Sequence, residues 1–283
     1  MTLGILLALS SALAYGAADL LGGVGSRRHS SWQIVLVGQA AGALVMLLAG
    51  LMRPGNPAPG DFAWALLAGV GSATGSIFLF RGLARGRMGL VAPISAVGAA
   101  VLPVLVGVAL GDRPGWLAGV GVLAALPGIW LVSRDTTSDR PAGTREALLD
   151  GAIAGVGFGV LFVALAQISA DAGMLPLAAN QLVGAILTMV AAAGLRQPWR
   201  PRRGMGAGVA GWGGASGVLG ASGTLAFILA TGTTSLAIAA VLASLYPAVT
   251  VLLAAGVLGE RIGTAQRTGI GICLLAVATL ALG

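Results

Sequence analysis

The sequence has no lysine, one cysteine, one histidine and two tyrosines, and only 9% of its 283 residues are charged. Soluble domains carry about 25% charged residues, so a soluble globular fold is excluded. A single cysteine cannot form an internal disulfide, and Cys273 lies within an apolar stretch. The single His29 belongs to no metal-binding or catalytic motif. We therefore expect no cofactor, no metal and no enzymatic activity.

Apolar residues dominate what is present. Hydrophobic residues make up 57% of the chain, with 47 glycines and 12 prolines, and the net charge is +7. A basic protein raises the question of nucleic acid, but here all 16 basic residues are arginines in short gaps between long apolar runs. That placement is typical of membrane proteins, so nucleic-acid binding is not expected.

The apolar runs are long enough to cross a bilayer, which takes about 20 residues per helix. No basic residue precedes the first run and many similar runs follow, so it is a transmembrane helix and not a signal peptide. The sequence predicts an all-α membrane protein with ten transmembrane helices. They lie at about 3–25, 32–52, 61–80, 88–110, 115–133, 148–170, 174–194, 206–230, 236–258 and 264–282.

Two halves of the chain resemble each other. A charged, proline-containing segment at 134–147 separates residues 1–133 from residues 148–283, which gives two predicted five-helix repeats and a linker. An offset of 148 aligns Gly111-Asp112-Arg113 with Gly259-Glu260-Arg261, and an offset of 142 aligns Gln39 with Gln181. Because each half crosses the membrane an odd number of times, the repeats must have inverted topology, as in secondary transporters.

Arginine placement predicts the orientation. Fourteen of the 16 arginines fall in odd-numbered connections, and only Arg53 and Arg113 fall in even-numbered ones. By the positive-inside rule the odd connections face the cytoplasm, so both termini of this cell-membrane protein are expected outside it.

Two segments carry a family resemblance. Residues 237–282 combine small residues, a proline-bearing helix, a Leu-Gly-Glu turn and a glycine-bearing last helix, and residues 90–133 repeat this pattern with Asp112 in place of the glutamate. The whole chain resembles the EamA-type transporters of the drug/metabolite transporter superfamily. The resemblance implies a ten-helix carrier of amino acids, nucleotide sugars, drugs or other small metabolites, many of the bacterial members working outward. Members usually have both termini in the cytoplasm, opposite to the arginine prediction.

Asp19 is the only acid well inside a predicted span. A charge at the bilayer centre is unfavourable by roughly several kcal/mol. Carboxylates within membrane spans therefore tend to face a water-filled cavity and bind a proton or cation. Asp19 is therefore the candidate for proton coupling or substrate binding. The alternative is a position near the interface, with a pairing to Arg27 or Arg28 or a hydrogen bond to a helix end.

Further polar residues are candidates for substrate binding. Gln39 and Gln181 occupy equivalent places in the two halves and would converge near the repeat axis, with Asn180 adding polar capacity. An interhelical hydrogen bond that only fixes packing is the alternative. In the resembled fold the third and eighth helices line the cavity, which adds Ser76 and Thr224.

Tyr15 and Tyr246 offer aromatic contacts to a substrate.

Prolines within the spans are candidate hinges, because each leaves a carbonyl without its usual donor. Pro93 and Pro103 lie in the fourth predicted helix and Pro247 in the ninth. Static kinks are the alternative. Asp112 and Glu260, despite the resemblance they carry, are expected to cap the next helix or pair across the turn.

These observations predict a gradient-driven carrier that works by alternating access, since the chain has no ATPase motif. An exporter of small metabolites such as amino acids is the expected function, with protons as a possible coupling ion and lipid as the solvent. A non-transporting membrane scaffold or receptor is the alternative. Oligomeric state does not follow from the sequence.

The orientation is testable with a reporter that is active only in the cytoplasm. Fused to the C-terminus it should be inactive, because the positive-inside rule places that end outside. The same reporter fused after residue 140, within an odd-numbered connection, is the control and should be active. Activity of the C-terminal fusion would overturn the prediction.

Overall fold

The computed structural model describes residues 2–84, 88–111, 115–133, 144–169, 171–200, 204, 206–258 and 262–282, and within them the chain forms eleven α-helices and no strand. The helices are α1 (Thr2–Arg28), α2 (Ser31–Met52), α3 (Pro59–Ala84), α4 (Met88–Ala109), α5 (Trp116–Ser133), α6 (Thr144–Ala166), α7 (Leu175–Gly194), α8 (Gly206–Thr231), α9 (Leu236–Ala243), α10 (Tyr246–Leu258) and α11 (Thr264–Leu282).

Helix length and composition fit a membrane. Among the described residues, seven segments are long and apolar enough to cross a bilayer, and two further apolar helical stretches at Ile94–Ala109 and Gly119–Val132 are shorter. Large apolar side chains point outward along these helices, as a lipid-facing surface requires. Leu13, Leu47, Leu123, Val156, Val190 and Leu274 are examples. The expectation of an all-helical multi-pass membrane protein is confirmed.

The expected helix at 236–258 is not continuous. Ser244 and Leu245 separate α9 from α10. Pro247 is the second residue of α10. Inside a continuous helix, Pro247 would lack the N–H that bonds the carbonyl of Ala243, and its ring would clash with that carbonyl. The first turn of a new helix needs no such donor, so the chain restarts there. The turn is held by Leu245 N–H donating to Leu242 O at 3.2 Å.

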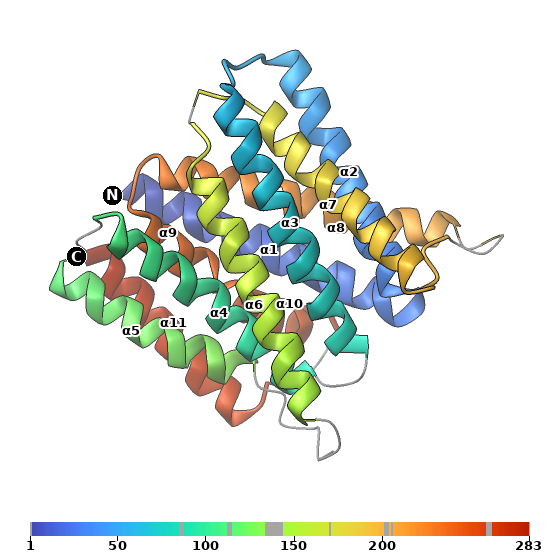
Figure 1. Cartoon of the computed structure of the whole chain (residues 1–283). Helices are drawn as coiled ribbons and strands as arrows, with labels where there is room; N and C mark the ends of the chain where they lie inside the picture. Colours follow the sequence, from blue (N-terminus) through green and yellow to red (C-terminus); the bar gives the residue numbers. More distant parts are fainter. Residues whose placement is uncertain are drawn as a thin grey trace.

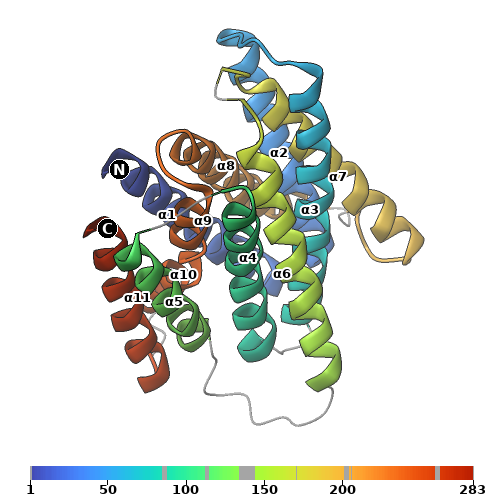
Figure 2. The same ribbon diagram turned by 60° about the vertical axis from the view of Figure 1, so that its left-hand side comes forward.

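Helix contacts follow a two-fold pattern when α1 to α5 are matched with α6, α7, α8, α9–α10 and α11. The contact of α1 with α8 then corresponds to that of α6 with α3, and the contact of α2 with α8 to that of α7 with α3. The contact of α4 with α6 corresponds to that of α9–α10 with α1, while α2–α7 and α5–α11 are each their own counterpart. Figures 1 and 2 both show α5 beside α11 and α3 beside α6.

Glycines allow these helices to touch through their backbones. A Cβ on Gly71 of α3 would lie 2.6 Å from the carbonyl oxygen of Gly157 of α6, and a Cβ on Gly98 of α4 would lie 2.8 Å from the Cα of Gly155. In α2 and α8, a Cβ on Gly217 would overlap the carbonyl group of Gly38. Because lipid provides no hydrophobic drive for helix association, such close backbone contact is a main source of packing energy in membranes.

The short helix α9 lies at the centre of this packing. All eight of its residues, Leu236–Ala243, are buried, and it contacts α1 and α4. The break at Ser244 and Leu245 is therefore an internal feature of the protein and is not exposed to lipid.

Gly217→Ala tests the glycine contacts. We expect a loss of about 1–3 kcal/mol in the free energy of unfolding, because the added methyl group displaces the backbone of α2. Gly214→Ala in the same helix is the matched control, since a Cβ there meets nothing within 4 Å. Urea unfolding in detergent measures both variants, and equal stability would contradict the packing account.

Candidate functional site

Asp19 differs from the two other acids found in the spans. Asp61 accepts hydrogen bonds from Ala58 N and from the N–H and hydroxyl of Ser169, and Asp150 is paired with Arg81. Asp19, half-buried in α1, makes no hydrogen bond or ion pair with any residue that the structure describes. The negative charge of a carboxylate within the bilayer needs to be neutralised or paired. The two carboxylate oxygens of Asp19 are therefore available to a proton or a cationic ligand.

Tyr15 and Tyr246, which the sequence offered as candidates for substrate contact, lie near Asp19. The Tyr15 hydroxyl lies 2.9 Å from Thr224 Oγ1 of α8. Because Thr224 donates its own proton to Gly220 O at 3.1 Å, Tyr15 donates to Thr224. Tyr15 lies about one helical turn before Asp19 in α1, and the buried Tyr246, at the start of α10, packs its carbonyl oxygen against Gly16 of the same helix. The structure thus brings Asp19, Tyr15, Thr224 and Tyr246 together from three helices.

An aromatic wall continues from this group. The rings of Tyr15 and Phe162 of α6 have centroids 6.0 Å apart at 61°, and Phe162 and Phe227 of α8 are 4.7 Å apart. Sequence reasoning missed both phenylalanines, because an isolated aromatic residue in an apolar run carries no signal. Helix contacts alone place them beside Tyr15.

The broken helix packs directly on the Asp19 helix. A Cβ on Gly16 of α1 would lie 2.8 Å from Tyr246 O, and Thr250 Oγ1 donates to Gly16 O at 3.2 Å. Gly16 lies about one helical turn before Asp19. The start of α10, with Pro247 in its first turn, is therefore in contact with the helix that carries the candidate carboxylate.

Gln39 and Gln181 lie at the contact of α2 with α7. Gln39 donates to Ser72 Oγ at 3.4 Å and accepts from Thr188 Oγ1 at 3.0 Å. Gln181 packs over Gly42, and Gln39 packs over Gly184, so each glutamine fills the space above the glycine of the facing helix. These reciprocal contacts fit the packing alternative.

The other sequence candidates are spread more widely. Asn180 is 1% exposed with no bond to its Oδ1 among the described residues, and its backbone carbonyl faces Gly69 of α3. Ser76 is half-buried in α3, and Pro103 is buried in the continuous helix α4. Pro93 has its backbone in the same helix, but its side chain lies outside the described part, as do Asp112 and Glu260.

An ion pair that the sequence did not reveal joins the two halves. The guanidinium of Arg81, in α3, pairs with Asp150 of α6, with Nε donating to Oδ1 at 3.1 Å. The Asp150 side chain is 2% exposed, and Phe78 packs 4.3 Å from the guanidinium. Neither residue has an equivalent in the other half, so the repeat offered no signal for this pair.

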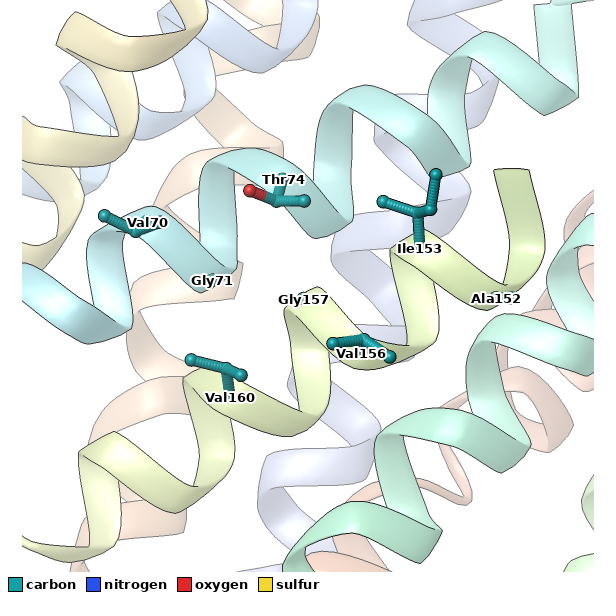
Figure 3. A pocket seen from close by; sticks show the side chains of 8 residues that line it. All are labelled: Val70, Gly71, Thr74, Ala152, Ile153, Val156, Gly157 and Val160. Atoms are coloured by element: carbon teal, nitrogen blue, oxygen red, sulfur yellow. The ribbon is translucent and has the colours of Figure 1, made fainter. Parts of the chain in front are cut away.

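A groove of about 330 Å³ lies between α3 and α6. Figure 3 shows its walls, in which Thr74 is the only side chain with a polar group; the lining residues are Val70, Gly71, Thr74, Ala152, Ile153, Val156, Gly157 and Val160. Val70 and Val156 are exposed, so this groove opens to the lipid side. Its lining does not include Asp19, and a single hydroxyl among apolar side chains is a poor site for a polar metabolite.

The fold and this polar group define a multi-pass membrane protein with two related halves, the class that includes carriers built from internal repeats. The sequence pattern of the EamA-like transporter family matches residues 2–134 and 147–282. The chain therefore belongs to the EamA-like transporter family, and the resemblance of the two proline-bearing segments is confirmed.

Solved structures agree on the architecture. Among the 26 matching chains, one named only "Crystal structure of protein" has a TM-score of 0.74 and 19% identity, covering 99% of this chain and 96% of its own. At that identity the similarity shows the fold alone. A search of the curated proteins gave no match.

Substitutions of the Arg81–Asp150 pair should have unequal effects on stability. Arg81→Gln removes the arginine that faces the buried Asp150 carboxylate, for which we expect a loss of about 3 kcal/mol. Asp150→Asn leaves a 34% exposed arginine that can reach water, so its effect should be smaller. The double variant should resemble Asp150→Asn.

Unfolding in detergent measures this cycle. Arg267→Gln, an exposed arginine in the first turn of α11, is the control and should change stability by less than about 0.5 kcal/mol. Additive effects of the two single substitutions would show that the pair is not coupled.

Proposed function

We propose that this protein is a gradient-driven carrier of the cell membrane that exports small metabolites, such as amino acids, by alternating access. The observation that carries the proposal is the Asp19 carboxylate, which has no partner among the described residues and lies where α1, α8 and α10 meet. Family membership supports transport as the general activity.

A carboxylate that has no partner among the described residues of a membrane protein can bind a cation. Leaving it ionised and bare at the bilayer centre costs about 2.5–3.5 kcal/mol on insertion scales. A proton removes that cost by neutralising the group, and the ammonium group of a substrate offsets it by pairing. We assign Asp19 to proton coupling, and pairing with a substrate ammonium group is the alternative role.

The neighbours of Asp19 suit an amphipathic substrate. Tyr15, Thr224 and Tyr246 offer hydroxyl groups, while Phe162 and Phe227 offer apolar ring surface. Cationic side chains are not among the contacts described for this group, which disfavours a multiply anionic substrate such as a sugar phosphate. Gln39, Gln181, Asn180 and Ser76 are assigned to helix packing around the site in this proposal.

Alternating access requires a part of the protein that bends. The α9–α10 break at Ser244 and Leu245 is the first candidate, because only short-range turn bonds hold it and Pro247 prevents the helix from closing. It lies beside Gly16, about one turn from Asp19, so bending there changes the surroundings of the carboxylate. Pro103 and Pro93 in α4 are secondary hinge candidates.

The proposal predicts a separation of two activities in Asp19→Asn. In proteoliposomes loaded with labelled amino acids, uptake driven by an imposed pH gradient should be lost, because the amide cannot take up a proton. Counterflow exchange without a gradient should persist, since it needs no net proton movement. Asp171→Asn is the control, because Asp171 is exposed in a connection between helices and should leave both fluxes unchanged.

Gradient-driven flux that survives Asp19→Asn would remove Asp19 from the coupling mechanism. Absence of flux in the folded, unaltered protein across a broad metabolite panel would favour the scaffold or receptor alternative. Protein folding is verified in parallel by thermal unfolding of each preparation.

A further inference from the structure

Two paired contacts between the halves are held by different kinds of bond. The contact of α3 with α6 and the contact of α1 with α8 are counterparts in the two-fold pattern. They would be chemically alike if the repeats were equivalent. Their bonds are different, and this difference has a consequence for how the protein can move.

At one end, α3 and α6 are linked by the Arg81–Asp150 ion pair. Separating the helices there would pull the Arg81 guanidinium away from the Asp150 carboxylate, which is 2% exposed, and breaking a buried ion pair is costly. The Phe78 ring against the guanidinium adds a cation–π contact on the same side.

At the other end of α3, Asp61 links α3 to the segment that follows α6. Asp61 Oδ1 accepts from the N–H and the hydroxyl of Ser169, just beyond α6, at 2.8 and 2.9 Å, while Oδ2 accepts from Ala58 N. Asp61 and Arg81 are separated along α3 by about 30 Å at 1.5 Å per residue, so the two links are placed near the two faces of the membrane.

Between these links the helices interlock. A Cβ on Gly157 would lie 2.6 Å from the backbone nitrogen of Gly75, and one on Gly71 would lie 2.6 Å from Gly157 O. With backbones this close, a sliding or tilting movement of α3 against α6 drives one main chain into the other.

The counterpart contact of α1 with α8 is made by hydroxyl groups. Ser11 donates to Gly223 O and Ser216 donates to Ala18 O, each at 2.8 Å, and Tyr15 bonds Thr224. A hydroxyl can exchange one carbonyl acceptor for another or for water without leaving a charge exposed to lipid. The broken helix α9–α10 also packs on α1.

We propose that α3 and α6 form a fixed frame across the two halves, clamped by Arg81–Asp150 and by Asp61–Ser169, and that the movement of transport takes place at the contacts of α1 with α8 and with the α9–α10 break. This inference rests on the proposed transport function. It excludes a cycle in which one half rocks as a rigid body against the other, since that movement would separate α3 from α6.

Two matched disulfides test the frame in a Cys273→Ser background. Gly75→Cys with Phe158→Cys bridges α3 and α6, where a Cβ on Gly75 lies 2.9 Å from Phe158 Cγ. Gly22→Cys with Ser216→Cys bridges α1 and α8, where a Cβ on Gly22 lies 3.1 Å from Ser216 Oγ. Each of these partner atoms is bonded to its own Cβ, so the two Cβ atoms of each pair lie within reach of the separation of about 3.8 Å found in disulfides.

Each variant is its own control, because amino-acid flux is compared before and after oxidation of the same proteoliposomes. The α3–α6 disulfide should leave flux at its reduced level, whereas the α1–α8 disulfide should lower flux to that of empty liposomes until reductant is added. Loss of flux on oxidising the α3–α6 pair, or unchanged flux on oxidising the α1–α8 pair, would overturn the frame.

Hydrogen exchange of the unaltered protein in nanodiscs keeps the test independent of transport. Amides in α3 and α6 should exchange more slowly than those in α1 and α10, and Arg81→Gln, but not Arg267→Gln, should speed exchange in α3 and α6. Equal exchange in the two helix pairs would overturn the frame. Absence of flux in the reduced variants and the unaltered chain would count against the proposed transport function alone.

Discussion

Hydrocarbon gives a buried polar group no water to bond with, and the arrangement of this protein follows from that constraint. Backbone groups are satisfied within helices, which is why the described residues contain no strand. Side-chain hydroxyls such as Ser10 and Ser222 return their protons to carbonyls of their own helix. Where a helix is interrupted, at Ser244 and Leu245, the interruption is buried among other helices and not turned to lipid.

The same constraint makes the three intramembrane acids comparable. Asp61 is surrounded by three donors and Asp150 is matched by an arginine, so each is compensated by the protein itself. Asp19 is not compensated by any described residue. Asp61 and Asp150 therefore stabilise the contact between α3 and α6. Asp19 is left to bind a proton or a cationic ligand reversibly.

Symmetry and asymmetry have separate roles in this molecule. The helix contacts obey a two-fold pattern, and Gln39 and Gln181 fill reciprocal spaces above Gly184 and Gly42. The charged pair, the tyrosine cluster and the helix break do not repeat. A duplicated scaffold with unrepeated chemistry is consistent with a protein in which each half contributes one helix to the α3–α6 frame and one helix to the α1–α8 contact.

The sequence by itself determined the helices and the class of protein. Apolar runs separated by arginines fixed most helix ends to within a few residues, because helix length is set by bilayer thickness and charge cannot enter the hydrocarbon. It also singled out Asp19, since an acid in an apolar run is conspicuous. Tyr15, Thr224 and Tyr246 were named as single residues, and only the fold showed that they meet.

Tertiary structure decided the rest. Arg81 and Asp150 each stand near a predicted helix end, so neither looked unusual until α3 and α6 were placed side by side. Pro247 was expected to bend a helix, but whether a proline kinks a span or ends it depends on the neighbours that satisfy the freed carbonyls. Phe162 and Phe227 became part of the site only through contacts between distant segments, which pattern and composition do not contain.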